Sequence, residues 1–220
     1  MNNLNLIGIH FHLGSPLFST IPYVLGIKKV IEFLSQFKKL QLKEFSPGGG
    51  FAVSYTVKDK TPSVKEYAEA ICNTLNESLD FYNFPKPKLI IEPGRAITGP
   101  AGVAIYSVGA IKNIENVRKY ISVDGGMGDN IRPALYGAKY EAVVINRLWD
   151  ERPKEKVTIV GKYCESGDIL VKDILLPEIK SGDIIAIPVS GAYSTSMASN
   201  YNMNPRPCLL YTSPSPRDRG

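Results

Sequence analysis

The sequence predicts part of a (β/α) barrel followed by a mostly β domain. Three short apolar runs, residues 6–10, 42–45 and 89–91, each lead into polar or glycine-rich sequence, and helical patterns fill the gaps between them. Beyond about residue 100 the sequence changes to short β-type runs. A (β/α) barrel carries its active site on the loops that follow the C-terminal ends of its parallel strands. We therefore expect the three loops to converge on one pocket.

Two amphipathic helices are predicted between the apolar runs. The first has apolar residues at helical spacing, at Ile27, Val30, Ile31, Leu34 and Phe37. The second is expected to begin with Thr61 as N-cap and Pro62 as its first helical residue. Its apolar stripe consists of Val64, Tyr67, Ala68, Ile71, Leu75 and Leu79. Cys72 lies beside this stripe and is expected to be a small buried side chain.

The second half of the chain contains β-type runs without a long amphipathic helix. Glycine, proline, asparagine and aspartate separate the runs, which lie at residues 103–111, 120–123, 142–145, 157–160 and 184–188. This pattern predicts a mostly β domain. We place the domain boundary near residue 100, with domains at 1–100 and 101–207.

The last residues look foreign to the rest of the chain. Residues 208–220 resemble the conceptual translation of a sequencing-library adapter, and the other interpretation is a native tail rich in proline and serine. We expect native sequence to stop near Pro207 and leave residues 208–220 out of the fold prediction.

Composition excludes several classes of function. The net charge is +5 and the lysines are scattered, which does not favour nucleic-acid binding. The three cysteines, Cys72, Cys164 and Cys208, are too few and too widely spaced for a disulfide framework or a zinc site. No apolar run approaches the roughly 18 residues of a membrane span, and the N-terminal residues lack the form of a signal peptide. We expect a soluble cytoplasmic protein.

Candidate chemistry follows the second and third apolar runs. Glycines at 48, 49 and 50 allow the backbone to approach an anion closely, although a glycine triplet alone is more typical of a flexible turn. Arg95 adds a guanidinium that suits the same anion. Glu92 is either half of a simple ion pair, with Arg95 as its basic neighbour, or a carboxylate that holds a heterocyclic nitrogen protonated.

Further candidates lie outside these loops. His10 and His12 are the only histidines, and either packing at a strand end or stacking on a ligand would explain them; no metal site is expected. Arg132 and Tyr136 are candidates for holding a carboxylate. Cys164 and Glu165 sit together in a polar turn, where the thiol is a candidate proton donor or nucleophile.

Taken in order, the motifs resemble those of the diaminopimelate decarboxylases, which are pyridoxal-phosphate-dependent enzymes of the alanine-racemase-like barrel group. The motifs are HFHLGS, PGGGF, EPGR, VDGGMGDNIRPALY, CESGD, GAY and SMASNYN, and the resemblance covers nearly all of residues 6–207. EPGR and the glycine triplet are shared with ornithine and arginine decarboxylases, whereas CESGD and SMASNYN indicate the diaminopimelate branch. The resemblance implies the C-terminal half of a (β/α)8 TIM barrel, followed by an incomplete, Greek-key-like β domain.

The resemblance also implies a site for pyridoxal 5'-phosphate. The residues it assigns to the cofactor are His12, Ser15, Gly48, Gly49, Gly50, Glu92, Pro93, Gly94, Arg95 and Tyr193. His12 would stack on the ring, and Ser15 with the three glycines would bind the phosphate. Glu92 would keep the ring nitrogen protonated, and the loop from Pro93 to Arg95 would complete the phosphate site.

For the substrate, the resemblance implies decarboxylation of meso-2,6-diaminopimelate to L-lysine and CO2. Cys164 would be the proton donor, with His12 as a second catalytic residue. The substrate-binding residues would be Arg95, Arg132, Tyr136, Glu165 and Tyr193. A distal carboxylate requires a guanidinium, and a distal ammonium requires a carboxylate such as that of Glu165. The turn with Cys164 and Glu165 is similar to one that reaches the partner's active site, which implies a homodimer.

The chain also departs from the family pattern. No segment resembles the surroundings of the family's cofactor-binding lysine, so we expect the 220-residue chain alone to be inactive. Pro16 stands where many relatives have glutamine. The near alternative is a sibling decarboxylase that acts on ornithine, arginine, lysine or carboxynorspermidine. An alternative of another class is a non-catalytic protein that carries the cofactor, but such a carrier needs neither a second domain nor a proton donor.

Overall fold

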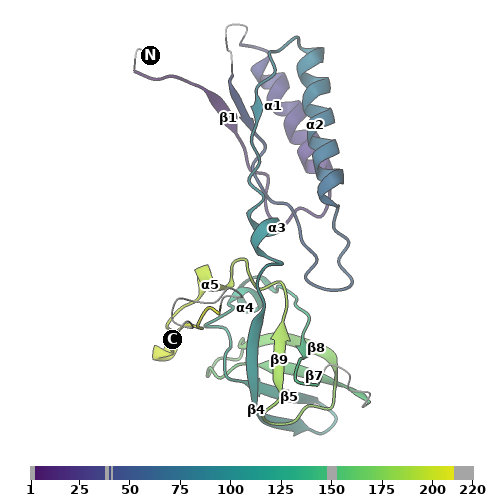
Figure 1. Ribbon diagram of the computed structural model, residues 1–220, viewed down its shortest axis with the longest axis vertical. Helices are drawn as coiled ribbons and strands as arrows, with labels where there is room; N and C mark the ends of the chain where they lie inside the picture. The colour runs from purple at the N-terminus through teal and green to yellow at the C-terminus, as the bar shows by residue number, and fades with distance from the viewer. Residues whose placement is uncertain (1–2, 38–39, 41, 148–152, 211–220) are drawn as a thin grey trace, which may run out of the picture. The chain divides into compact units, whose positions relative to one another are not determined.

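The computed structural model describes residues 3–37, 40, 42–147 and 153–210. The chain forms two compact units, Met1–Ala101 and Gly102–Gly220, which are described separately below (Figure 1). The division falls one residue beyond the predicted boundary near residue 100.

The first unit contains a parallel three-stranded sheet in the order β1-β2-β3. Its strands are β1 (Gly8–His10), β2 (Glu44–Ser46) and β3 (Lys88–Leu89). Ile9 pairs with Phe45, and Phe45 pairs with Leu89, so the three strands run side by side in one direction. Their C-terminal ends therefore lie at one edge of the sheet. The predicted parallel strands are confirmed, although each is shorter than its apolar run.

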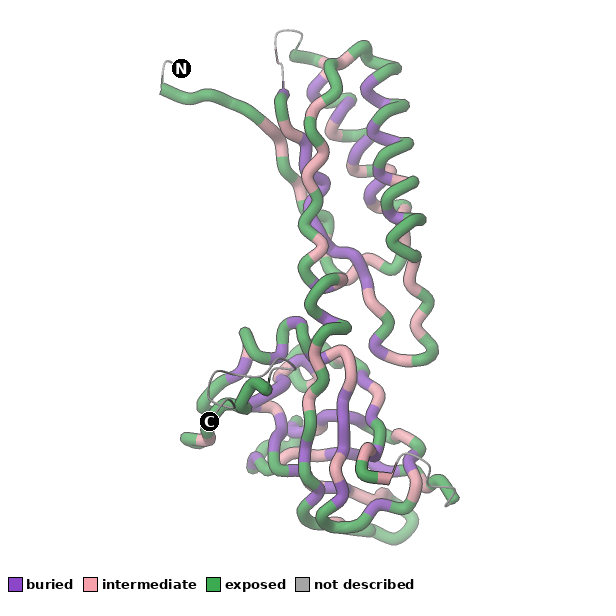
Figure 2. Tube along the Cα trace, in the orientation of Figure 1, coloured by how far each residue is buried: buried purple, intermediate pink, exposed green. Residues whose placement is uncertain are grey.

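Two long helices, α1 (Ile21–Leu34) and α2 (Val64–Phe81), pack with the sheet around one core (Figure 1). A third helix, α3 (Gly94–Thr98), is a short turn after β3. Buried positions recur along α1 and α2 at helical spacing (Figure 2). The largest core side chains are Tyr23, Ile27, Ile31, Leu34, Phe45, Phe51, Tyr67, Ile71, Leu75 and Leu79.

Four side-chain predictions for the helices are wrong, and one of them is Ala68, which is exposed instead of lying on the buried stripe of α2. Phe37 lies beyond the end of α1 and is 47% exposed, and Val64 in the first turn of α2 is 81% exposed. Cys72 is exposed as well, because it follows the buried Ile71 by about 100° around the helix and so leaves the packed face. The buried stripe instead includes Thr74 and Ser78.

Helix α2 begins two residues later than predicted. Its N-cap is Ser63 instead of Thr61. The Ser63 hydroxyl accepts a hydrogen bond from Glu66 N at 3.2 Å, and Ser63 N donates to the Glu66 carboxylate at 2.7 Å. This reciprocal capping box satisfies two backbone amides that the first turn would leave unpaired, so it defines the start better than Thr61-Pro62 does.

The second unit contains a six-stranded mixed sheet in the order β6-β9-β4-β5-β7-β8. The strands are β4 (Ala104–Ile114), β5 (Arg118–Val123), β6 (Val143–Val144), β7 (Lys154–Val160), β8 (Ile169–Pro177) and β9 (Ile184–Ile187). The β5–β7 pair is parallel and the other pairs are antiparallel. Strands β6 and β8, at the two ends of the order, approach each other, so the sheet forms a nearly closed barrel.

Each of the five predicted β-type runs contains a strand, but the sequence reading missed β8. Its apolar alternation is interrupted by Lys172 and Asp173, and Asp173 has a left-handed backbone with φ of 56°. Buried residues of the sheet, among them Ile121, Ile159 and Ile185, fill the barrel core. Short helices α4 (Arg132–Tyr136), α5 (Ser194–Met197) and η1 (Tyr201–Met203) connect or follow the strands. Residues 208–210 are exposed coil, and residues 211–220 of the proposed foreign tail lie outside the described residues.

Candidate active site

The loops that follow the three parallel strands come together, as predicted. Phe11 N donates to Ser46 O at 3.0 Å, and Glu92 N donates to Gly48 O at 3.0 Å. Leu17 N donates to Gly50 O at 2.8 Å. These hydrogen bonds join the loops that follow neighbouring strands. Polar groups from all three strand ends therefore lie at one edge of the sheet.

The glycine triplet is required by this close approach. Gly48 and Gly50 have φ of +77° and +93°, a region that favours glycine. A Cβ atom at Gly49 would collide with the carbonyl of Glu92, and one at Gly50 would collide with the carbonyl of Gly14. The loops are therefore too tightly packed for any side chain at these positions. The three glycines are buried, and the amides of Gly48 and Gly49 donate to Ser46 Oγ and His12 Nδ1.

Arg95 is buried on α3 and binds the loop after β1. Its Nε and Nη2 each lie 3.3 Å from the hydroxyl of Ser15, and its Nη1 lies 2.5 Å from the hydroxyl of Tyr55. The guanidinium also lies over the Tyr55 ring, 5.7 Å from its centroid. No role was predicted for Tyr55 from the sequence. Arg95 and Ser15 together offer guanidinium and hydroxyl donors for one anion.

Glu92 pairs with a histidine. His10 Nε2 lies 3.1 Å from Oε1 of Glu92, and Ser46 donates to the same oxygen at 3.2 Å. Naming Arg95 as the basic neighbour of Glu92 was therefore incomplete, since His10 arrives from the opposite outer strand. His12 Nδ1 accepts a hydrogen bond from Gly49 N at 3.3 Å. Both histidines are exposed, which favours a ligand-facing position over packing at the strand end.

In the second unit, Asp168 ties the turn of Cys164 and Glu165 to a neighbouring loop. Its carboxylate accepts hydrogen bonds from Tyr163 N at 2.8 Å and from Met127 N at 2.6 Å. Asp168 is 3% exposed, and this burial raises the pKa of its carboxyl group despite the two backbone donors. The two hydrogen bonds therefore hold the turn between β7 and β8 in place against the neighbouring loop.

Each functional candidate in this turn has a polar partner from η1. Asn202 Nδ2 lies 3.6 Å from the sulfur of Cys164, and the Tyr201 hydroxyl donates to the carboxylate of Glu165. The hydrogen bond to Glu165 and the charge of that carboxylate raise the pKa of Tyr201. Both residues belong to the SMASNYN motif, which is their only signal in the sequence analysis above, and no role was predicted for either of them.

The other predicted substrate residues are divided between the units. Arg95 belongs to the first unit, and Arg132, Tyr136 and Tyr193 belong to the second, as Glu165 does. Arg132 is 6% exposed, and its Nη1 lies 2.5 Å from the hydroxyl of Tyr140. Tyr136 and Tyr193 are 64% and 40% exposed.

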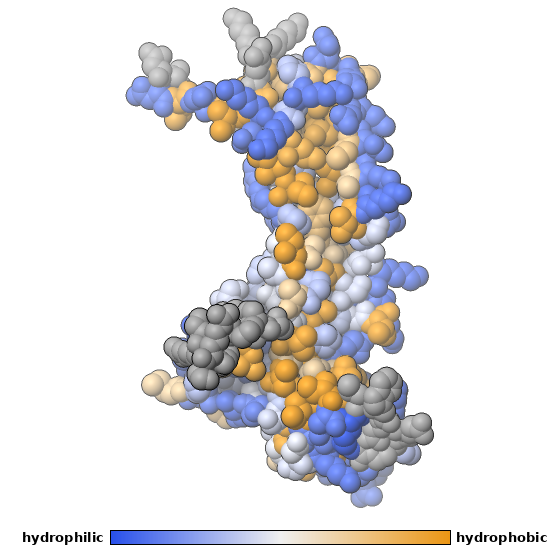
Figure 3. Space-filling model, in the orientation of Figure 1, coloured by the Kyte–Doolittle hydropathy of each residue, from blue (hydrophilic) through white to orange (hydrophobic). Residues whose placement is uncertain are grey.

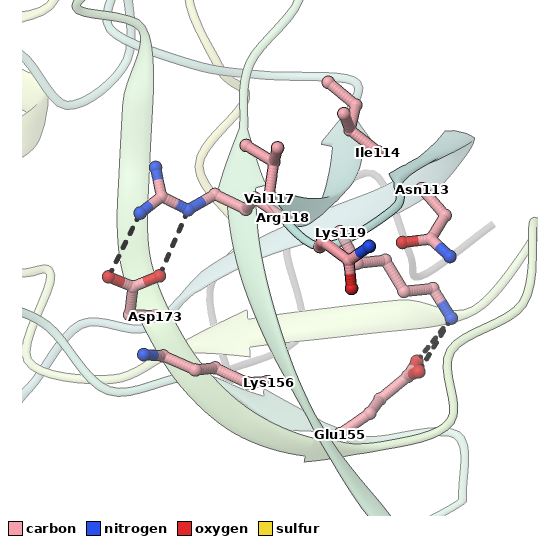
Figure 4. Close-up of a pocket in the computed structure, with 9 residues that line it drawn as sticks. Asn113, Ile114, Val117, Arg118, Lys119, Glu155, Lys156 and Asp173 are labelled. Atoms are coloured by element: carbon pink, nitrogen blue, oxygen red, sulfur yellow. Dashed lines mark hydrogen bonds and ion pairs between the residues drawn. The ribbon is translucent and has the colours of Figure 1, made fainter.

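A pocket of about 410 Å³ lies elsewhere in the second unit (Figure 4). It is lined by parts of β4, β5, β7 and β8 and by none of the candidate residues. Lys119 pairs with Glu155 at 2.6 Å, and Arg118 pairs with Asp173 at 3.2 Å. These two ion pairs neutralise four of the charged groups in the pocket, and Lys156 adds one further positive charge to its lining.

Metal-ligand clusters and membrane-spanning helices are both absent from the described part of the chain. Within residues 3–37, 40, 42–147 and 153–210, no group of three or more histidine, cysteine, aspartate or glutamate side chains is arranged to hold a metal ion. In the same ranges, no helix is long and apolar enough to cross a membrane.

A cradle of glycine backbone, hydroxyl and guanidinium at the ends of parallel strands defines a class of proteins that bind a phosphorylated ligand. The comparison with known families narrows that class. Residues 23–191 match the family described as pyridoxal-dependent decarboxylase, C-terminal sheet domain, and the chain belongs to this family.

Similar curated proteins carry one name. The chain is 45% identical over 212 residues to a diaminopimelate decarboxylase of Bacillus subtilis, which covers 95% of this chain and 48% of that protein. It is 46% identical over 214 residues to a diaminopimelate decarboxylase of Synechocystis, which covers 94% of this chain and 45% of that protein. The chain thus spans about half the length of the curated relatives it matches.

Solved structures similar to this chain include diaminopimelate decarboxylases and a lysine/ornithine decarboxylase. A diaminopimelate decarboxylase from M. jannaschii in complex with L-lysine aligns with a TM-score of 0.86 at 36% identity, over 92% of this chain and 46% of that one. A lysine/ornithine decarboxylase from Vibrio vulnificus in complex with cadaverine aligns with a TM-score of 0.78 at 26% identity, over 93% of this chain and 54% of that one.

Proposed function

We propose that the complete enzyme containing this chain decarboxylates meso-2,6-diaminopimelate to L-lysine and CO2 with pyridoxal 5'-phosphate. One comparison carries the proposal: the chain is 45% identical to a diaminopimelate decarboxylase over 95% of its length, against 26% identity to a lysine/ornithine decarboxylase. The alternative, a sibling enzyme acting on ornithine, arginine, lysine or carboxynorspermidine, has less support from these identities.

We further propose that the first unit is the C-terminal half of a (β/α)8 barrel. Its sheet is parallel, and parallel sheets are normally covered on both faces. Apolar side chains on and beside the sheet are nevertheless exposed, including Leu6, Ile7, Leu13 and Ile91. Apolar surface is visible over this part of the first unit (Figure 3). Further strands and helices of a barrel would cover that surface.

The residues at the strand ends fit the cofactor. The hydroxyl of Ser15 lies 3.3 Å from two nitrogens of the Arg95 guanidinium, which suits a phosphate that accepts from both residues. The crowded backbone of Gly48–Gly50 leaves no room for a side chain, and the loop of Pro93 and Gly94 that follows β3 would complete the phosphate site beside it. His12 lies next to this backbone, with its Nδ1 at 3.3 Å from Gly49 N, and its ring would stack on the cofactor.

Glu92 would bind the ring nitrogen. Pyridoxal phosphate, when bound, delocalises the electron pair that remains as CO2 leaves. A carboxylate opposite the ring nitrogen favours its protonated form through a charge-assisted hydrogen bond. His10 and Ser46 hold the Glu92 carboxylate at 3.1 and 3.2 Å, so its direction is set before any ligand arrives.

Cys164 would return a proton to the substrate carbon, and a distal clamp would select the substrate. Arg132 would bind the distal carboxylate and Glu165 the distal ammonium, with Arg95, Tyr136 and Tyr193 completing the site. Arg132 is 6% exposed, so a substrate without that carboxylate leaves a buried guanidinium poorly matched. Such a mismatch costs about 1–3 kcal/mol, which corresponds to roughly fivefold to 150-fold in specificity.

We also propose that the enzyme is a cytoplasmic homodimer. Cys164 and Glu165 are exposed on their turn, which suits a turn that reaches a second subunit's active site. Cys72 and Cys164 are both free thiols, which suits a reducing compartment.

The proposal is tested with the complete enzyme and pyridoxal phosphate. We expect CO2 release from meso-diaminopimelate and at most slow release from ornithine, arginine, lysine or carboxynorspermidine. Release from one of these siblings alone would overturn the assigned substrate, and release from none would overturn the assigned reaction. The 220-residue chain by itself is expected to release no CO2, because it spans about half the length of the relatives.

A further inference from the structure

We propose that Tyr201 and Asn202 are positioning residues of the active site: Asn202 orients the thiol of Cys164, and Tyr201 orients the carboxylate of Glu165. The inference rests on the proposed function, in which Cys164 donates a proton and Glu165 binds the distal ammonium. Two neighbouring residues of η1 meet two neighbouring residues of the β7–β8 turn, across 36 to 38 residues of sequence. Each pair is joined by its own polar contact.

The backbone at η1 is held in an uncommon conformation. Asn202 has φ of 53° and ψ of 29°, and Met203 has φ of 61°, both in the left-handed region. Asparagine tolerates this region better than most residues, whereas methionine rarely adopts it. Two consecutive residues of this kind cost free energy, and such strain clusters at functional sites. In η1, the side chains of residues 201 and 202 on this left-handed segment contact the Cys164–Glu165 turn.

Asn202 has the chemistry to assist proton release from Cys164. Its side-chain amide donates toward the sulfur at 3.6 Å. A donor in that position stabilises the negative charge that remains on sulfur after a thiol gives up its proton. It therefore favours delivery of the proton to the substrate carbon without touching the substrate itself.

Tyr201 has the chemistry to orient Glu165 and leave its charge intact. A phenol donates one hydrogen bond to the carboxylate, and the remaining lone pairs stay available to an ammonium group. The hydrogen bond to Glu165 and the charge of that carboxylate raise the pKa of Tyr201, so the phenol stays protonated as a donor at neutral pH. Its ring also contacts Tyr163, at 5.8 Å between centroids, and the backbone amide of Tyr163 is bound by Asp168.

The two roles are separable with two conservative variants. Asn202→Gly removes the amide but adopts the left-handed backbone without strain, so it isolates the side chain from the conformation. Tyr201→Phe removes the hydroxyl but keeps the ring that contacts Tyr163. Tyr82→Phe, at the exposed C-cap of α2, is the matched control outside the site.

The first readout is the rate at which iodoacetamide alkylates Cys164 in the complete enzyme. Mass spectrometry of the peptide with Cys164 is needed, because Cys72 is exposed too. We expect Asn202→Gly to slow alkylation about three- to tenfold, since the reacting sulfur loses its hydrogen-bond donor, and Tyr201→Phe to leave the rate within about twofold. An unchanged or faster rate in Asn202→Gly would overturn the role of Asn202. Cys164 is already exposed, so a turn that is only loosened would not slow its reaction.

The second readout is binding of L-lysine by calorimetry, which needs no turnover. Decarboxylation leaves the distal ammonium and carboxylate in the product, so L-lysine still engages Glu165. We expect Tyr201→Phe to weaken L-lysine binding about three- to tenfold and to raise KM with little change in kcat. Asn202→Gly is expected to lower kcat with little change in KM. Equal effects of the two variants on both constants would overturn the division of roles.

Failure of this inference is distinguishable from failure of the proposed function. If the enzyme releases no CO2 from meso-diaminopimelate, the function is wrong, and the alkylation rates still judge Asn202. If the enzyme decarboxylates meso-diaminopimelate but Asn202→Gly alkylates as fast as the parent, the positioning role alone is wrong.

Discussion

The imidazole Nε2 of His10 lies 3.1 Å from Oε1 of Glu92, although 82 residues separate them in sequence. The contact joins the ends of β1 and β3, the two outer strands of the parallel sheet. Ser46, at the end of the middle strand, donates to the same carboxylate. The Glu92 carboxylate thus contacts residues at the ends of the other two strands, and these contacts fix its orientation.

Glu92→Gln in the complete enzyme should lower decarboxylation strongly. The variant keeps the shape but replaces a charge-assisted hydrogen bond by a neutral one, which costs about 1.5–3 kcal/mol, or about tenfold to a hundredfold in kcat. Glu32→Gln, which removes a carboxylate of an exposed ion pair on α1, is the matched control. A Glu92→Gln enzyme as active as the control would remove Glu92 from the catalytic machinery.

Arg95→Lys should weaken binding of the phosphorylated cofactor. Lysine keeps the charge but cannot contact Ser15 and Tyr55 at once, as Arg95 does through Nε, Nη2 and Nη1. We expect the dissociation constant for pyridoxal 5'-phosphate to rise about tenfold or more, measured by absorbance titration. Affinity for pyridoxal, which lacks the phosphate, should change little. Equal losses for both ligands would contradict a phosphate role for Arg95.

Asp168→Ala should destabilise the second unit by at least about 2 kcal/mol, because it leaves the buried amides of Met127 and Tyr163 without their acceptor. Asp168→Asn keeps an acceptor and should cost less. The sign of the pH dependence follows from the raised pKa of Asp168. A raised carboxyl pKa means that ionisation costs stability as pH rises through the folded value. The parent should therefore gain stability relative to Asp168→Asn as pH falls, and urea unfolding at several pH values measures this.

Ser63→Ala should lower the stability of helix α2 by about 1 kcal/mol, because it removes one half of the capping box. Hydrogen exchange of the amides in the first turn reports the loss locally. Ser35→Ala, at the C-cap of α1, is the control, because this serine caps no helix start. Equal protection of the first turn of α2 in both variants would contradict the role of the Ser63 hydroxyl.

The capping box also has a pH dependence. Hydrogen bonds from the backbone and side chain of Ser63 lower the pKa of Glu66. A lowered carboxyl pKa contributes stability that is present above the unfolded value and lost as pH falls through the folded value. Amide protection in the first turn of α2 should therefore decline in acid. Protection that is unchanged between neutral and acidic pH would show that Glu66 does not hold the helix start.

Local sequence predicted part of the fold. Helical spacing placed Ile27, Ile31, Tyr67 and Ile71 in the core correctly, because the period of a helix fixes which side chains share a face. The same reasoning failed for Cys72, whose exposure depends on where the packed stripe is centred. Strand β8 was missed because its irregular backbone at Asp173 breaks the alternation.

Residue type and position beside apolar runs were enough to pick out the candidate groups for chemistry: the glycine triplet, Glu92, Arg95, and the pair Cys164 and Glu165. The partners of these groups came from the folded chain alone. His10 meets Glu92, Ser15 meets Arg95, and Asn202 meets Cys164 across 82, 80 and 38 residues. Such contacts depend on strand order, register and loop path, which bring together residues that no local periodicity relates.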